Sequence, residues 1–122
     1  MVILNKGYLK KENRIIDLQY VDIMNDCVWA YDRVADKAIK YNSKNVNVLY
    51  NSFFKDNSDI ELFTDDVVED SEGTQYMVVH TGTGWFLRNR LSKEDSPMSK
   101  FVFSDEKDKL RVSKIGNLNM KA

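Results

Sequence analysis

Apolar and polar residues alternate in short runs along the first third of the chain. From Ile16 to Tyr20 the side chains alternate with a period of two, as a half-buried strand requires. This stretch lies within a longer mixed segment, residues 14–23. Asn25 and Asp26 form a turn pair, and an apolar run resumes over residues 27–31. The pattern predicts two strands joined by a tight turn.

Residues 32–40 fit two interpretations. Apolar residues at positions 34, 35, 38 and 39 fall at helical spacing, and Asp32 is a candidate N-cap. Alternatively, residues 38–41 form the second arm of a hairpin that turns at Asp36 and Lys37. The hairpin is favoured because both flanks of the turn are aromatic. Residues 42–45 then predict a loop, and Val46, Val48 and Tyr50 alternate as a further strand.

The most regular pattern lies between residues 61 and 88, where turns separate short apolar runs. It predicts a β-meander with strands at residues 66–70, 74–80 and 85–88. Gly73 supplies the positive φ that the first turn needs. The run from Tyr76 to Val79 does not alternate, which is typical of a strand buried on both faces.

The last third of the chain completes an all-β pattern. Residues 89–99 contain the only proline and predict a mobile, exposed surface loop. Strands are expected at 100–103 and 110–115, around a charged turn at 105–108. Seven to nine short strands predict an all-β, barrel-like fold of antiparallel strands in a single domain, residues 1–122, with one short helix as the alternative for 32–40. The predicted core is Ile16, Leu18, Tyr20, Val28, Val48, Val67, Tyr76, Val78, Trp85, Leu87, Phe101, Val102 and Ile115.

Length and composition support a packed cytoplasmic protein. A chain of 122 residues with 43% hydrophobic residues suits one modest core. No apolar run approaches the roughly 20 residues of a membrane helix, and the N-terminus has no secretory signal pattern. The only cysteine, Cys27, excludes an intrachain disulfide and predicts a buried thiol rather than a nucleophile.

No catalytic, metal or cofactor site can be argued from the residues, so we expect a protein that is not an enzyme. The only histidine, His80, has no argued partner for nucleophilic catalysis, and we expect it to be structural. Gly82 and Gly84 follow a strand but precede no helix, which indicates a hairpin turn rather than a phosphate site. The acids between residues 65 and 72 lack the spacing of a calcium loop.

Aromatic residues stand beside basic residues after residue 84, a combination that single-stranded nucleic-acid grooves use for stacking and phosphate contact. The candidate contacts are Trp85, Phe86, Arg88, Arg90, Lys93 and Arg111. Core packing is the favoured interpretation of the rings, because a net charge of −1 argues against a phosphate-binding surface. Weak binding of single strands is therefore the alternative function.

Acidic and basic residues are unevenly distributed along the chain, although the net charge is only −1. Residues 55–72 contain eight acids and one base, whereas residues 88–114 contain eight bases and five acids. Solvated turns are the simpler and favoured interpretation, and a candidate acidic interaction surface is the alternative. Its residues are Asp65, Asp66, Glu69, Asp70 and Glu72. Such a surface is predicted to meet Arg88, Arg90 and Arg111, within a subunit or between subunits.

Several segments, in order, resemble the YopX family of small bacteriophage proteins. They are KENRIID at residues 11–17, FKDNSDIELFTDDVV at 54–68 and IGNL at 115–118, with residues 76–79 and 85–87 matching the family's Y-V-V and aromatic hairpin in type. The ordered set covers nearly the full length. Phe53, Asp59 and Asp65 stand where the family pattern has glycine. Asp tolerates left-handed φ better than most residues, whereas Phe does not.

The resemblance implies a phage or prophage origin, a β-rich barrel-like fold and self-association into oligomers, with no known catalytic residues. We therefore expect a phage-encoded accessory protein in the bacterial cytoplasm. It would act as a self-associating protein-interaction module that binds a host or phage protein. Exposed sheet edges, such as residues 46–50, are the natural contacts.

Overall fold

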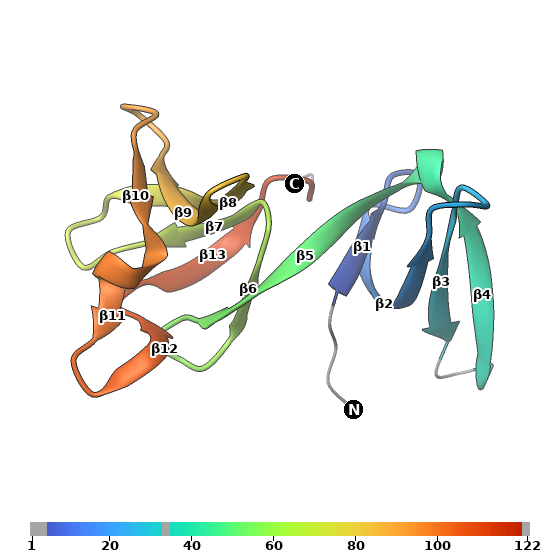
Figure 1. The fold of residues 1–122 in the computed structure, drawn as a ribbon, viewed down its shortest axis with the longest axis horizontal. Helices are drawn as coiled ribbons and strands as arrows, with labels where there is room; N and C mark the ends of the chain where they lie inside the picture. The colour runs from blue at the N-terminus through green and yellow to red at the C-terminus, as the bar shows by residue number, and fades with distance from the viewer. Residues whose placement is uncertain (1–4, 33–34, 121–122) are drawn as a thin grey trace. The chain divides into compact units, whose positions relative to one another are not determined.

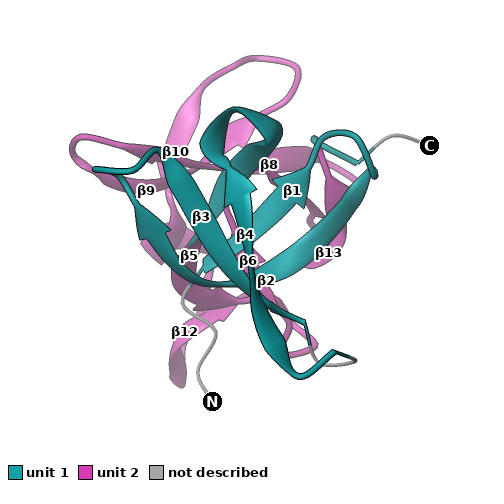
Figure 2. Cartoon of the chain, turned by 90° about the vertical axis from the view of Figure 1, so that its right-hand side faces the viewer, with its two compact units in different colours: residues 1–50, 119–122 teal, residues 51–118 magenta. Residues whose placement is uncertain are grey.

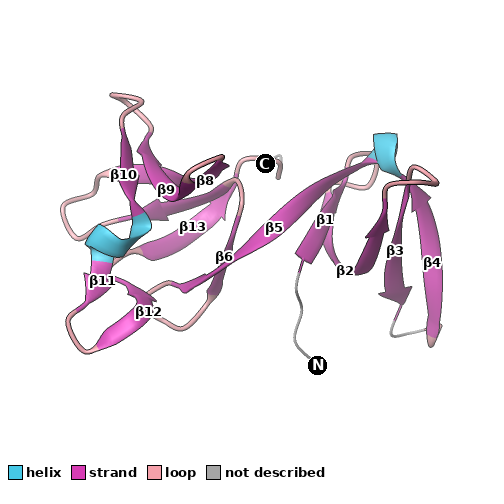
Figure 3. Cartoon of the chain, in the orientation of Figure 1, coloured by secondary structure: helices cyan, strands magenta, loops and turns pink. Residues whose placement is uncertain are grey.

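The computed structural model describes residues 5–32 and 35–120, which are built of short strands and two 3-10 turns (Figures 1 and 3). The predicted all-β class with short antiparallel strands is confirmed. The chain divides into two compact units (Figure 2). Unit 1 comprises Met1–Tyr50 with Asn119–Ala122, and unit 2 comprises Asn51–Leu118. The single domain expected over residues 1–122 stays a prediction.

Unit 1 is an antiparallel sheet in the order β5-β1-β2-β3-β4. Its elements are β1 (Asn5–Leu9), β2 (Arg14–Asp22), β3 (Cys27–Asp32), β4 (Lys37–Asn42), the 3-10 turn η1 (Ser43–Asn45) and the first half of β5 (Val46–Lys55). The favoured hairpin is confirmed, because β3 and β4 pair from Asp32 opposite Lys37 to Cys27 opposite Asn42. Residues 33 and 34, including Val34 of the helical alternative, lie outside the described residues.

The hydrophobic cluster of unit 1 requires a glycine and a bulge. Its buried members are Leu9, Leu18, Val28, Ala30 and Val46. A Cβ on Gly7 would lie 2.8 Å from Val46 Cγ1, so any other residue here would have to displace the packed side chains of the cluster. The register shifts between Leu18 and Tyr20. Tyr20 therefore stacks on Trp29, with ring centroids 6.0 Å apart, and is 53% exposed. Its predicted core position is wrong because the bulge interrupts the period of two.

Unit 2 contains a five-stranded sheet in the order β10-β9-β8-β7-β13 and a smaller group in which β5 pairs with β6 and β12, and β12 with β11. The bounds are β6 (Glu61–Phe63), β7 (Asp66–Glu69), β8 (Gln75–Thr81), β9 (Gly84–Asn89), β10 (Asp95–Pro97), η2 (Met98–Phe101), β11 (Val102–Phe103), β12 (Glu106–Leu110) and β13 (Ser113–Asn117). The predicted meander is confirmed in β7, β8 and β9, and Gly73 has a φ of 82°.

The cluster of unit 2 confirms part of the predicted core. Its buried members are Leu62, Val68, Val78, Leu87, Met98, Leu110 and Val112, with Phe54, Tyr76, Trp85, Phe101 and Val102 packed against them. Val67 is also buried. Ile115 is 50% exposed, so its predicted core position is wrong. The register shifts between Lys114 and Gly116, which leaves Ile115 as the extra residue of a bulge.

Two further expectations for unit 2 hold only in part. Residues 91–95 are exposed as predicted, but β10 pairs with β9 and the following turn buries Met98 in the cluster. The prediction of an exposed loop over all of residues 89–99 is therefore wrong. In the run from Tyr76 to Val79 only Val78 is fully buried, and its neighbours Met77 and Val79 are half-buried.

Candidate functional site

A hollow of about 570 Å³ on unit 2 unites residues that lie far apart in the sequence. The end of β7 contributes Glu69, and the turn between β7 and β8 contributes Asp70 and Glu72. These are three of the five acids predicted to form a surface. Arg111, one of the predicted bases, lies in the same lining. Arg88 and Arg90 are not part of this lining, so the expected meeting of the acids with all three arginines stays a prediction. We call this site the unit-2 hollow.

Arg111 is held in the unit-2 hollow by backbone carbonyls. Its Nε donates to the carbonyl oxygen of Phe101 at 3.4 Å, and its Nη2 donates to that of Lys100 at 3.2 Å. Its backbone N–H also donates to the Phe101 carbonyl at 2.7 Å. These bonds link the β12–β13 connection to the end of η2. They fix a positive charge beside the aromatic rings of the hollow.

Aromatic side chains form the apolar part of the unit-2 hollow. Phe101 and Phe103 line it, and Phe101 meets the ring of Tyr76 edge-on, with centroids 5.2 Å apart. The Tyr76 hydroxyl donates to Asp70 Oδ2 at 3.4 Å. Burial raises the pKa of Tyr76 above 10.0, and the charges of Asp70 and Glu72 raise it further. The phenol therefore keeps its proton at neutral pH and remains a donor to Asp70.

The acidic turn is rigid because the Asp70 carboxylate caps it. Asp70 Oδ1 accepts hydrogen bonds from the backbone N–H groups of Glu72 and Thr74, both at 2.9 Å. Such a local bond replaces water as the partner of turn N–H groups. Glu69 lies on β7 and accepts from Gln75 Nε2 at 3.3 Å. The carboxylates of the hollow are therefore presented from a fixed backbone.

The other two predicted acids are not part of the hollow. Asp66 is 1% exposed, and its carboxylate accepts from the Phe63 N–H at 2.7 Å and from Asn117 Nδ2 at 2.9 Å. Lys114 Nζ lies 3.3 Å from the same carboxylate. Burial nevertheless raises the pKa of Asp66 above 3.8. Asp65 has a φ of 69° in the preceding turn. Asp66 is thus a structural carboxylate and not a surface acid.

The structure separates the aromatic residues of the nucleic-acid candidate. Trp85 packs against the unit-2 cluster, and its ring lies 4.6 Å from that of His80. Phe86 follows it on the same strand and therefore points to the opposite face of the sheet, where it pairs with Val79 and Pro97. Strand β9 thus does not present both rings to one ligand.

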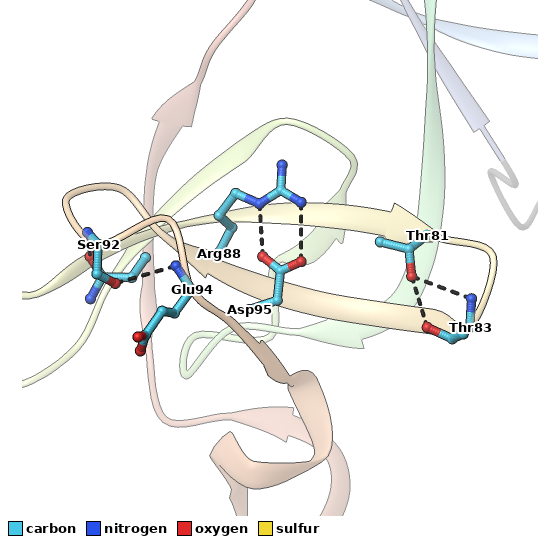
Figure 4. A network of polar contacts seen from close by, with 7 residues as sticks. Thr81, Thr83, Arg88, Ser92, Glu94 and Asp95 are labelled. Carbon is cyan, nitrogen blue, oxygen red and sulfur yellow. Dashed lines mark hydrogen bonds and ion pairs between the residues drawn. The ribbon is translucent and has the colours of Figure 1, made fainter.

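The basic residues of the same candidate are mostly engaged in hydrogen bonds. Arg88 donates to both carboxylate oxygens of Asp95, at 2.7 and 3.0 Å (Figure 4). Arg90 donates to Gln75 Oε1 at 3.0 Å. Lys93, with a φ of 64°, lies in the exposed β9–β10 connection, where the Glu94 N–H donates to Ser92 Oγ (Figure 4). Nucleic-acid binding through these residues stays a prediction.

Cys27 and His80 have different environments. Cys27 is buried in unit 1, whereas His80 is exposed on β8 of unit 2.

Within residues 5–32 and 35–120, no group of three His, Cys, Asp or Glu side chains is placed to hold a metal ion. No helix in the described part of the chain has the length and hydrophobicity needed to cross a membrane.

Two features of unit 2 were missed by sequence reasoning. Asp56 is buried, and its carboxylate accepts from the N–H groups of Ser58, Ile60 and Lys114 at 2.8–3.0 Å. The spacing Asp-x-Ser, typical of an Asx-turn, was its only signal. Phe53 has a φ of 63° although β5 continues through it to Lys55. The polar composition of residues 51–60 is typical of a turn-rich segment, so the sequence does not indicate that the strand continues.

The chain was compared with protein-family models, with curated proteins and with solved structures, and none of the three comparisons gives a match.

Proposed function

We propose that this protein is a non-enzymatic, self-associating protein-interaction module, encoded by a phage or prophage and acting in the bacterial cytoplasm. The unit-2 hollow carries the proposal. It combines aromatic rings, one fixed arginine and several carboxylates on a rigid turn. Aromatic residues and arginine are enriched where proteins bind one another, and charged groups around them select the partner.

The lining of the hollow indicates the chemistry of its ligand. Phe101 and Phe103 offer apolar contact, and Glu69, Asp70 and Glu72 favour a positive charge close by. An apolar side chain next to a lysine or arginine satisfies both requirements. A surface segment of a protein, from a second copy or from a host or phage protein, can present this combination.

The phage origin rests on the ordered resemblance of residues 11–17, 54–68 and 115–118 to the YopX pattern. One local feature agrees with that pattern. The backbone has a φ of 63°, 64° and 69° at Phe53, Asp59 and Asp65, the three positions where the pattern has glycine. Glycine adopts this conformation without the steric cost of a side chain. A left-handed backbone at these positions is one that glycine would accommodate, which supports the proposal.

Sedimentation velocity over a wide concentration range tests self-association. We expect a mass above the 14.2 kDa of one chain, rising with concentration. Glu72→Lys, which reverses a charge in the hollow, should shift association to higher concentration. Glu94→Lys makes the same charge change in the β9–β10 connection and is the matched control. A wild-type protein that remains a strict monomer at every concentration would contradict the self-association part of the proposal.

A further inference from the structure

Phe53 combines backbone strain with an exposed ring. Its φ of 63° lies in the left-handed region, which is unfavourable for a bulky side chain. The ring is 63% exposed and belongs to neither hydrophobic cluster. Within residues 5–32 and 35–120 it makes no aromatic contact. A phenylalanine here strains the backbone without adding to either core.

Buried polar side chains impose this conformation. Asn51 Oδ1 accepts from the Phe53 N–H at 2.8 Å, and Ser52 Oγ accepts from the Phe54 N–H at 3.1 Å. Ser52 Oγ also donates to the Leu62 carbonyl at 2.6 Å. Asn51 and Ser52 are both buried. These bonds hold the bulge in β5, so the Phe53 ring is kept in solvent by the fold itself.

We propose that Phe53 of one copy inserts into the unit-2 hollow of a second copy and is the central contact of self-association. This inference rests on the proposed function and names its contact. The ring matches the apolar lining of Phe101, Phe103 and Ile115. Strained residues persist where the surrounding structure over-determines them, and they cluster at functional positions.

Charge complementarity supports a second copy as the occupant. Lys55 follows Phe53 by two residues and makes no ion pair within the described residues. Glu72, in the lining of the unit-2 hollow, likewise makes none there. The segment that carries the ring is thus followed by the positive charge that the acidic turn favours. Both halves of this contact, ring with lysine and hollow with carboxylates, belong to the same unit.

The contact is heterologous, because each copy contributes a ring on one side and a hollow on the other. Such contacts either close into rings or continue into open chains. One copy with a defective ring and one with a defective hollow can still form a single intact junction. This property distinguishes ring-in-hollow binding from a symmetric pairing of two Phe53 rings.

Two variants and their mixture test the proposal by sedimentation velocity. Phe53→Gly removes the ring, and Ile115→Lys places a positive charge in the hollow at an exposed position. We expect each variant alone to be a 14.2 kDa monomer at concentrations where the wild type associates. An equimolar mixture should form dimers. Leu91→Ala, at another exposed apolar position, should associate like the wild type.

Thermal unfolding separates loss of binding from loss of folding. Phe53→Gly should raise the melting temperature of the monomer, because glycine adopts a φ of 63° without strain. A lower melting temperature would overturn the claim of strain. If Phe53→Gly associates like the wild type, the proposed contact is overturned while the self-association function stands. A mixture that remains monomeric would overturn insertion into the hollow.

Discussion

The side-chain amide of Asn117 donates a 2.9 Å hydrogen bond to the buried carboxylate of Asp66, which stands opposite it in the β7–β13 ladder. Asn117 also donates to the carbonyl of Thr64 at 3.3 Å. The last strand of unit 2 is thus joined to the start of β7 by side-chain bonds as well as by backbone pairing. The Asp66 carboxylate also accepts from the Phe63 N–H and lies 3.3 Å from Lys114 Nζ.

Asp66→Asn should destabilise the protein by about 1–3 kcal/mol, the usual cost of leaving a buried polar group unsatisfied. An amide keeps one acceptor oxygen, and its NH₂ group then faces the N–H donors of Phe63 or Asn117. Urea unfolding at neutral pH measures this loss. Asp105→Asn makes the same change at an exposed turn and should be nearly neutral. Equal stability of the two variants would contradict the structural role of Asp66.

The difference in stability between the wild type and Asp66→Asn should depend on pH in an unusual direction. Burial raises the pKa of folded Asp66 above 3.8, so the folded state keeps this proton to higher pH than the unfolded state does. The contribution of Asp66 to stability is therefore complete below pH 3.8 and declines as the pH rises through the raised pKa. The free energy of unfolding of the wild type should therefore exceed that of Asp66→Asn by less as the pH rises over this interval. A difference that grows with pH would contradict the raised pKa.

The Arg88–Asp95 pair should behave in the opposite way. The two hydrogen bonds from Arg88 lower the pKa of Asp95 below 3.8. The contribution of Asp95 to folding stability is present above pH 3.8 and is lost as the pH falls through the lowered pKa. Asp95→Asn should therefore lower the melting temperature slightly at neutral pH, and the difference should disappear in strong acid. Added salt should also reduce this difference in melting temperature, because salt screens the charges of an exposed pair.

Gly7→Ala should destabilise unit 1 by about 1–3 kcal/mol, the range for overpacked cores. The new methyl group would lie 2.8 Å from Val46 Cγ1 and 3.0 Å from Leu18 Cδ2. Gly82→Ala is the matched control, because a Cβ there has no neighbour within 4 Å and the turn is exposed. Chemical unfolding should separate the two variants clearly. Similar midpoints would show that the Val46 and Leu18 side chains can shift to make room for the methyl group.

Trp85→Ala should cost less than the roughly 3–5 kcal/mol of a fully buried aromatic truncation. The indole packs against the unit-2 cluster on one side but keeps part of its surface in solvent beside His80. Leu87→Ala, at a fully buried position two residues along β9, supplies the comparison. Thermal unfolding measures both losses. A Trp85→Ala midpoint equal to that of the wild type would remove the indole from the core.

The local sequence determined most of the strands and their turns. The period of two over residues 16–18 places Leu18 in the core, because successive side chains of an uninterrupted strand point to opposite faces. The turn residues between 66 and 88 determined the meander, since Gly73 accepts a backbone that other residues resist. These features depend on neighbouring residues alone, so they can be derived without any knowledge of the partner strands.

Only the tertiary structure decided which side chains left that pattern. Bulges beside Leu18 and Lys114 turned Tyr20 and Ile115 outward, and a bulge depends on how the partner strand pairs. Burial converted Asp66 from an expected surface acid into a structural carboxylate. Arg111 and the acidic turn line one hollow because β13, which begins two residues after Arg111, pairs with β7, a contact between residues more than 40 positions apart. Such non-local pairings leave no periodic signal in the chain, so the candidate site could not be assembled from the sequence.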